Sequence, residues 1–548
     1  MIKQRYGLRW MYALSKGVRG YYALLAVAGI ATTVVNIGLT TVLKNLVDIA
    51  AGESGLSLWR NLIVSAGFVL LEGAAAVVTS LAYRLSTEKV TKKLRLGLSQ
   101  TYYGSDLLAI EKRHAGEYLT NLTVDVESVS SCIPSLIRKT VGNGLSAVAA
   151  ILYLFFLSWK MALVLLVSIP LLILCVAIFS PVLQKNSSND KKNEENTRVF
   201  LQEILQKFTI FKVGVPTQFI YQKLCALLDK KIESAKRLGL AEGGSDFLNN
   251  IMGTTVTLIS IGGGAYLATQ GELLVGSLIA VVQLTNYIVW PFIGTGEIIS
   301  QVNQSLASAK RLHAIDELEP EKSPAEDLER KSIALLRLND LSFSYGEKKI
   351  LDHVQADFMP DRIIGIVGES GSGKSTMLKV IAGLYKPVDG SVEAVCRDNT
   401  SYFGSMVPYT GIVPPDNLIF QDSIRANICM GRAFDEEKFQ RCVQMANISD
   451  YIESLEEKCD TIIGDGKRAL SSGQEQRIAI ARILYQDAKL LLFDEPTANL
   501  DAESVAIFVQ TLKRIVSGHI CLIATHDKNL IKECGELYQV ENAKLIKQ

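Results

Sequence analysis

The sequence predicts a multi-domain membrane protein in which a six-helix all-α transmembrane domain precedes an α/β domain. The chain has 548 residues, which is enough for more than one domain. Its hydrophobic fraction of 48% and its mean hydropathy of +0.22 are high for a soluble protein. The long apolar runs crowd into the first part of the chain, as a membrane domain requires.

Charge and cysteine content argue against a nucleic-acid partner, a zinc site and a disulfide framework. The net charge is +1, so no global electrostatic field favours nucleic acid, and we expect no nucleic-acid partner. The nine cysteines include no C-x-x-C pair, so neither a zinc site nor a disulfide framework is predicted. Residues 1–19 are basic and lack a small-residue cleavage site, so we expect a retained first helix and not a signal peptide. Within them, residues 5–18 are expected either to lie flat at the membrane interface or to form a disordered tail.

Six apolar segments are long enough to span a membrane. A tight turn joins the third segment to the fourth, and another joins the fifth to the sixth. Two long connections are rich in lysine and arginine. The positive-inside rule places these long connections and both termini in the cytoplasm. We therefore expect a multi-pass protein of the plasma membrane, the inner membrane of a bacterium. The six segments are residues 21–43, 61–83, 139–158, 161–183, 247–269 and 273–295, and the long connections are residues 84–138 and 184–246.

Polar residues within these spans are candidate substrate contacts. Glu72 lies in the middle of a span, where an ionised carboxylate facing lipid is costly, so it should face the bundle interior or a water-filled cavity. It either contacts substrate or a proton, or it pairs with a polar residue on another helix. Asn286 is a weaker candidate for substrate contact, because polar residues between helices more commonly stabilise packing.

The chain divides at a charged segment. Residues 317–332 contain Pro320 and Pro324 and are predicted to be a linker. The transmembrane domain therefore comprises residues 1–316. Residues 333–548 are sufficient for an independent α/β domain.

The strongest motif follows an apolar run, residues 362–367, that is typical of a buried strand. Residues 368–375 match the phosphate-binding pattern G-x-x-x-x-G-K-[ST], and a helix-like segment follows them. Backbone N–H groups and a helix N-terminus would attract phosphate there, with Lys374 on the β- and γ-phosphates and Ser375 on Mg²⁺. The alternative is a glycine-rich turn without a ligand. The predicted nucleotide-binding residues are Gly368, Glu369, Ser370, Gly371, Ser372, Gly373, Lys374, Ser375 and Thr376.

Two further motifs are typical of a P-loop NTPase. Asp494 and Glu495 end a continuous apolar run, where Asp494 would hold Mg²⁺ through water and Glu495 would orient or deprotonate the attacking water. The alternative for this pair is two solvated acids in a turn. Residues 471–474, at a predicted helix start, would offer N–H donors and a hydroxyl to phosphate, or would act as a simple N-cap.

In this order, the motifs resemble those of the nucleotide-binding domain of ATP-binding-cassette (ABC) transporters. Residues 471–474 resemble that family's signature, with Ser472 where glycine is usual, and the resemblance assigns Ser471, Gly473 and Gln474 to nucleotide binding. His526 matches the switch histidine, which contacts the γ-phosphate. The family's D-loop and adenine-stacking aromatic match Asp501 and Tyr345, respectively.

Upstream, residues 114–126 and 158–160 resemble the exporter-type (type IV) transmembrane domain of the same family. This resemblance implies a half-transporter that acts as a dimer with an identical or related second subunit, embedded in membrane lipid. Two ATP molecules would be sandwiched between the subunits, and short helices in the long connections would transmit the motion. We expect export of an amphipathic small molecule or peptide. The alternatives are a siderophore or metal-chelate importer and an ATP-gated regulatory or channel-like protein with weak turnover.

A second departure from the family pattern bears directly on the ATP site. The family has a glutamine, which helps hold Mg²⁺ and couples nucleotide to the membrane domain, where this chain has Pro415. Proline has neither a side-chain oxygen nor a backbone N–H, so it does not substitute for glutamine. A mixed pair, in which a different subunit completes the second site, therefore remains an alternative to a homodimer.

The Pro415→Gln variant is predicted to raise ATP turnover, because it restores a side-chain oxygen where the family holds Mg²⁺. Phosphate release from membranes that contain equal amounts of the two proteins measures this effect. An unchanged or lower rate would count against the predicted cost of Pro415.

Overall fold

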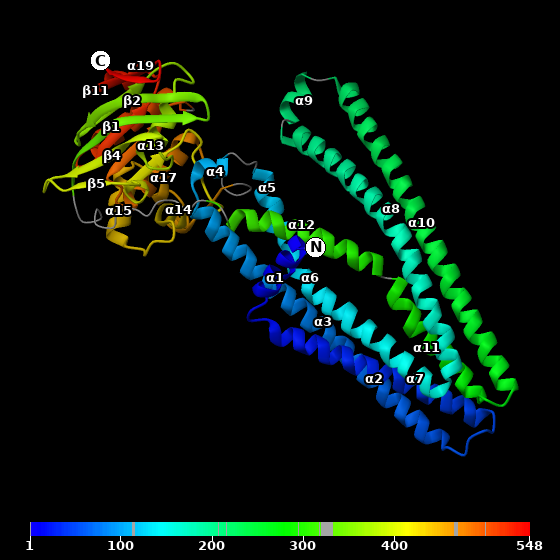
Figure 1. Ribbon diagram of the computed structural model, residues 1–548. Helices are drawn as coiled ribbons and strands as arrows, with labels where there is room; N and C mark the ends of the chain where they lie inside the picture. Colours follow the sequence, from blue (N-terminus) through cyan, green and yellow to red (C-terminus); the bar gives the residue numbers. More distant parts are fainter. Residues whose placement is uncertain are drawn as a thin grey trace. The chain divides into compact units, whose positions relative to one another are not determined.

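The computed structural model describes residues 2–111, 115–206, 208–214, 216–293, 295–316, 318, 332–464, 470–498 and 500–548. They form two compact units, one comprising residues 1–102 and 114–317 and the other residues 103–113 and 318–548 (Figure 1). The first unit is all helical and the second contains sheets and helices, which confirms the predicted fold class. The predicted linker, 317–332, lies outside the described residues except at positions 318 and 332.

Long helices make up the first unit, and α8 and α10 run side by side (Figure 1). Three of them continue well beyond the predicted spans, as the helical periodicity of the connections indicates. The helices are α1 (Ile2–Leu14), α2 (Arg19–Ala50), α3 (Leu58–Tyr103), α5 (Ala115–Thr120), η1 (Asn121–Asp125), α6 (Val126–Lys139), η2 (Thr140–Gly144), α7 (Leu145–Leu157), α8 (Trp159–Gln206), α9 (Phe208–Gly214), α10 (Thr217–Thr269), α11 (Val275–Ile293) and α12 (Thr295–Asp316).

Within the described residues, four helices are long and apolar enough to cross a membrane, and two shorter apolar stretches cover part of the remaining predicted spans. The third predicted span, 139–158, differs from a plain α-helix because η2 is π-helical, and a second π-helical turn, η1, lies in the predicted connection before it. Apolar periodicity does not distinguish a local π-helix from an α-helix, so these segments were not predicted. The four helices are Arg19–Ala50, Leu58–Tyr103, Gly116–Leu157 and Thr217–Thr269, and the shorter stretches are Trp159–Leu171 and Val275–Pro291.

Polar contacts stabilise the helical unit at both ends. The Gly276 N–H donates to the buried Asp48 carboxylate at 2.8 Å, and a Cβ at Gly276 would lie 2.2 Å from the Lys44 carbonyl oxygen, so only glycine fits. A second contact joins α12 to η1. There, Nε of Arg311 donates to Oδ2 of the buried Asp125 at 2.8 Å. Such a paired buried carboxylate restrains two helices relative to each other.

Two sheets form the second unit. An antiparallel sheet has the order β2 (Lys348–Phe358), β1 (Ile333–Tyr345), β4 (Asp389–Cys396) and β5 (Ser401–Phe403). A mainly parallel sheet has the order β12 (Lys544–Lys547), β11 (Glu536–Glu541), β3 (Arg362–Val367), β10 (Ile520–Ala524), β9 (Leu490–Asp494) and β6 (Thr410–Val413). Every residue of β9 and β10 is buried, as expected for parallel strands that are covered on both faces.

Helices cover the parallel sheet, and one short helix comes from far upstream in the chain. This helix, α4 (Leu107–Glu111), packs Leu107 and Leu108 on the core of the second unit. The remaining described elements are α13 (Lys374–Ile381), η3 (Val407–Tyr409), β7 (Asp422–Ser423), α14 (Ile424–Cys429), α15 (Glu436–Met445), α16 (Ser449–Glu453), η4 (Lys458–Asp460), β8 (Ile462–Ile463), α17 (Ser472–Tyr485), α18 (Ala502–Ile515) and α19 (Lys528–Lys532).

Candidate active site

Three parallel strands bring the predicted catalytic motifs to one edge of the sheet. The central strand, β10, pairs with β3 on one side and β9 on the other, so Ala524 lies opposite both Ile366 and Asp494. The carboxyl ends of all three strands therefore coincide. The phosphate loop, Asp494 with Glu495, and His526 follow these ends directly, which is the usual place for a ligand site in an open α/β sheet.

The loop that precedes α13 has the geometry of an anion site. Gly373 caps the helix at φ +107°, a left-handed conformation that favours glycine, and its position exposes the first N–H groups of α13. The nearly buried Lys374 donates from Nζ to the carbonyl oxygens of Gly368, at 2.9 Å, and Glu369, at 3.1 Å. The buried Ser372 hydroxyl has no hydrogen-bond partner among the described residues. A phosphate oxygen in the loop would satisfy that hydroxyl.

Ser375 and Asp494 are placed to hold Mg²⁺. Ser375 Oγ donates to Asp494 Oδ1 at 2.9 Å. Burial raises the pKa of Asp494, the Ser375 hydrogen bond opposes this effect, and the nearby Glu495 carboxylate adds to it. A cation at this position would favour the ionised form. Across the described residues, no group of three or more His, Cys, Asp or Glu side chains could hold a metal. One carboxylate, one hydroxyl, water and phosphate oxygens would therefore form the shell, and this donor set fits Mg²⁺.

Glu495 lies between two potential proton or charge partners. Its Oε2 is 2.7 Å from Nδ1 of the exposed His526, and its Oε1 is 3.8 Å from Lys374 Nζ. The Glu495 backbone has φ +48°, a strained conformation for a residue with a side chain. A hydrogen bond of 2.8 Å from Glu495 N–H to the Ala524 carbonyl oxygen helps hold that conformation. The strain thus directs a carboxylate toward the phosphate loop.

Tyr345 presents a partly exposed ring beside this loop. The ring is 39% exposed and is supported edge-on by Phe343, with ring centroids 5.1 Å apart. Its hydroxyl lies 3.4 Å from Thr376 Oγ1. An aromatic face that is supported from behind and open in front is suited to stacking a flat base, in agreement with the predicted role of Tyr345.

The signature and D-loop residues lie at the starts of α17 and α18. Ser471 and Gln474 form a capping box, in which Gln474 N–H donates to Ser471 Oγ at 3.3 Å, so the simple N-cap is present in this chain. Asp501 caps α18 through Ser504 N–H, which lowers the Asp501 pKa. A Cβ at Gly473 would lie 2.8 Å from Ser504 Oγ. No hydrogen bond or ion pair joins these four predicted residues to the loop 368–376 in the described part of the chain.

Pro415 lies beside Glu495. The two residues line a cavity of about 140 Å³ together with Asn417 and Ser472. Pro415 and Ser472, which both depart from the family pattern, therefore line the same cavity. The side-chain oxygen of Asn417 is buried and has no hydrogen-bond partner among the described residues. Sequence reasoning did not select Asn417, because its burial depends on how the loop folds over Glu495.

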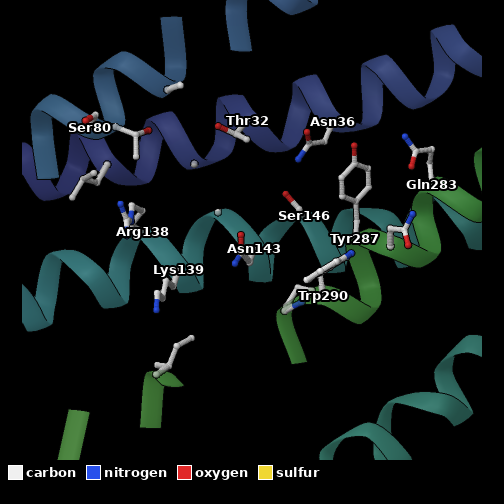
Figure 2. Close-up of a pocket in the computed structure, with 18 residues that line it drawn as sticks. Thr32, Asn36, Ser80, Arg138, Lys139, Asn143, Ser146, Gln283, Tyr287 and Trp290 are labelled. Carbon is white, nitrogen blue, oxygen red and sulfur yellow. The ribbon is translucent and has the colours of Figure 1, made fainter. Parts of the chain in front are cut away.

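A second candidate site is a cavity of about 960 Å³ within the helical unit. Figure 2 shows Arg138, Lys139 and Ser80 toward one end, with Gln283, Tyr287 and Trp290 toward the other. The predicted substrate residue Asn286 lines this cavity, whereas Glu72 is exposed on α3 and is not among the lining residues. The lining residues are Leu25, Gly29, Thr32, Asn36, Ala76, Thr79, Ser80, Arg138, Lys139, Gly142, Asn143, Ser146, Gln283, Asn286, Tyr287, Trp290, Pro291 and Ile298.

Comparison with known families identifies both parts of the chain. Residues 22–292 match the ABC transporter transmembrane region, and residues 351–498 match the ABC transporter domain. The chain belongs to the ABC transporter family. Both regions occur in one chain, so this ABC transporter is an exporter half-transporter whose ATP-binding domain is an ATPase coupled to transport. The predicted family, fold class and ATPase activity are thereby confirmed.

Curated relatives of this ABC transporter subunit are bacterial proteins of nearly the same length. An ATP-dependent lipid A-core flippase from Vibrio vulnificus (strain YJ016) is 23% identical over 544 residues, which cover 97% of this chain and 93% of the relative. Flippases of the same description from Pectobacterium atrosepticum and Salmonella typhimurium are 24% identical, covering 96% of this chain and 92% of each relative. These similarities support a multi-pass protein of a bacterial inner membrane.

The Glu495→Gln variant is predicted to lose hydrolysis by about a hundredfold or more, because the amide does not accept a proton from water. ATP binding should persist, since the shape and the surrounding loop are kept. Phosphate release and filter binding of labelled ATP measure the two effects. Glu453→Gln, which alters only an exposed partner of Lys458, should leave both unchanged. Hydrolysis that survives in Glu495→Gln would remove the assigned base.

Proposed function

We propose that this ABC exporter subunit moves an amphipathic molecule with an anionic head group away from the cytoplasm, in a dimer that works by alternating access. The observation that carries this proposal is the composition of the 960 Å³ cavity. Its described lining includes two cationic side chains, those of Arg138 and Lys139. The flippase description of the relatives supports a lipid-like substrate.

The charges of the cavity favour an anion. A guanidinium and an ammonium at one end of the lining contribute positive potential there, and surrounding hydrocarbon strengthens their attraction for a negative group. The Arg138 guanidinium lies over the Tyr83 ring, 4.7 Å from its centroid, which restrains the side chain. Phosphate or carboxylate oxygens would thus find a partly preorganised partner.

The rest of the cavity fits an uncharged portion of the same molecule. Trp290 and Tyr287 offer aromatic surface, while Asn36, Asn286 and Gln283 offer amide groups. Amphipathic molecules present these needs together, because their apolar parts bury against aromatic rings and their polar linkages need hydrogen-bond partners. The predicted role of Asn286 in substrate contact is retained in this proposal.

Hydrolysis would supply the energy for this movement. Lys374 and the N–H groups of α13 bind the phosphates, Ser375 and Asp494 hold Mg²⁺, and Glu495 accepts a proton from the attacking water. When bound, Mg²⁺ neutralises charge that develops on the phosphate oxygens. His526, whose Nδ1 lies 2.7 Å from Glu495 Oε2, follows the same strand edge and would contact the γ-phosphate. Ser471 and Gly473 would act on the nucleotide of the second subunit. Among the described residues, no hydrogen bond or ion pair joins them to the loop 368–376 of their own chain.

Pro415 bears on the identity of that second subunit. A site with Pro415 beside Glu495, where the family has its glutamine, is expected to turn over slowly. We therefore favour a pair with a related subunit that carries the missing glutamine, over two copies of this chain. The cytoplasmic location of both termini and of the ATPase unit is part of the same proposal.

Transport in inside-out vesicles tests this function. A fluorescent phosphate-bearing lipid should enter the lumen when ATP and magnesium are added, and Glu495→Gln should abolish this entry. Uptake that is independent of ATP, or movement only from the lumen outward, would contradict export.

Charge selectivity tests the head-group assignment. The double variant Arg138→Gln with Lys139→Gln should lower the preference for the phosphate-bearing lipid over a zwitterionic lipid with the same tails by about tenfold, since two charge-assisted hydrogen bonds are lost. Lys160→Gln, which removes an exposed cation at a turn outside the cavity, is the matched control. An unchanged preference in the double variant would rule out an anion site at this end of the cavity.

A further inference from the structure

The short helix α4 is held on the second unit by a partly buried polar contact as well as by apolar packing. Glu111, at its last position, accepts hydrogen bonds from Lys379 Nζ, at 3.0 Å, and from the Tyr385 hydroxyl. Lys379 also donates to the Tyr385 hydroxyl at 3.1 Å. Glu111 thus forms one closed hydrogen-bonded triangle with Lys379 and Tyr385, which lie 268 and 274 positions further along the chain. The charge of the carboxylate strengthens both bonds to it.

Tyr385 carries this contact into the adenine-binding aromatic cluster. Its side chain is only 1% exposed. The Tyr385 ring stacks on Phe343 with centroids 5.4 Å apart, and it meets the Tyr345 ring edge-on at 6.0 Å. Tyr345 itself rests on Phe343. The orientation of the ring that would stack on the base therefore depends on a neighbour whose hydroxyl is bonded to α4.

The same triangle reaches the phosphate side of the site. Lys379 belongs to α13, the helix whose N-terminus closes the phosphate loop. Its ammonium also lies over the Tyr385 ring, 5.1 Å from the centroid. Burial, followed by the bond to Glu111, raises the pKa of Tyr385, so the hydroxyl keeps its proton and stays a donor to the carboxylate.

We propose that Tyr385 is a positioning residue that ties the adenine-stacking ring of Tyr345 to Glu111 of α4. When a base stacks on Tyr345, it restrains the Tyr345 and Tyr385 rings together and thereby strengthens the hold of Tyr385 on Glu111. By linkage, the converse also holds, and a firmly seated α4 favours base binding. The coupling bears on transport because α4 follows the membrane helix α3 in the chain and belongs to the ATPase unit. In this one respect, it rests on the proposed function.

The proposal predicts that the base of the nucleotide, and not its phosphates, is sensed at α4. A triphosphate without a base can occupy the loop 368–376 but does not touch Tyr345. It should therefore leave the Glu111 contact unchanged. Mere structural support of the fold by Tyr385 would not distinguish between these two ligands.

Hydrogen exchange of the full-length protein in lipid nanodiscs tests this coupling. AMP-PNP with magnesium should slow exchange of amides 104–111 by about threefold or more in the wild type, because a coupling near the lower end of the usual range has this size. Tripolyphosphate with magnesium should protect amides 368–376 but leave amides 104–111 unchanged. No transported substrate is needed, so the result does not depend on the nature of the cargo.

Tyr385→Phe is the decisive variant, because it keeps the ring and removes only the hydroxyl. In this variant, AMP-PNP should still protect amides 368–376 but no longer protect amides 104–111. Tyr451→Phe, which removes the hydroxyl of a partly buried tyrosine on α16, should behave like the wild type. Glu111→Gln should reproduce the Tyr385→Phe result if the carboxylate is the partner.

Three outcomes would overturn the proposal. The first is a wild-type protein whose amides 104–111 do not respond to AMP-PNP. The second is an equal response to tripolyphosphate, which would assign the effect to the phosphates. The third is a Tyr385→Phe variant with the wild-type response. Each of these leaves transport by the 960 Å³ cavity untouched, so failure here is distinct from failure of the proposed export.

Discussion

The in-register pairing of three parallel strands is the constraint on which the ATP site depends. Since β10 is bonded to β3 and β9 at the same level, the phosphate loop, the Asp494–Glu495 pair and His526 all begin at one edge. A slip of one residue in either pairing would turn each side chain to the opposite face of the sheet. The complete burial of β9 and β10 opposes such a slip, because it would expose apolar groups or bury polar ones.

Local strain and burial then refine this edge into a chemical site. The left-handed backbone of Glu495 directs its carboxylate toward Lys374 and His526, and the buried Asp494 accepts a hydrogen bond from Ser375. Within the second unit, aromatic and charged contacts run from Tyr345 by way of Tyr385 to Glu111. The helical unit separately contains a cavity with two cations at one end. The ATPase domain and the proposed cargo site thus belong to one chain.

Much of this organisation could be predicted from the sequence. The strand–loop–helix order around Lys374, the apolar run before Asp494 and the lengths of the apolar segments follow from local patterns, which a single sequence displays. Other features depend on tertiary contacts. The triangle of Glu111, Lys379 and Tyr385 joins positions more than 250 residues apart, and the π-helical turns lack a periodic signal. Glu72, selected for its charge, is exposed on its helix, and its contact with substrate stays a prediction.

Retention of labelled ATP with magnesium is the most direct test of the central claim that this strand edge is a nucleotide site. Purified protein, reconstituted with any companion subunit, should retain labelled ATP. Lys374→Ala should lower that retention by about tenfold or more, because a charge-assisted phosphate contact is lost. Failure of the wild-type protein to retain labelled ATP would contradict the account.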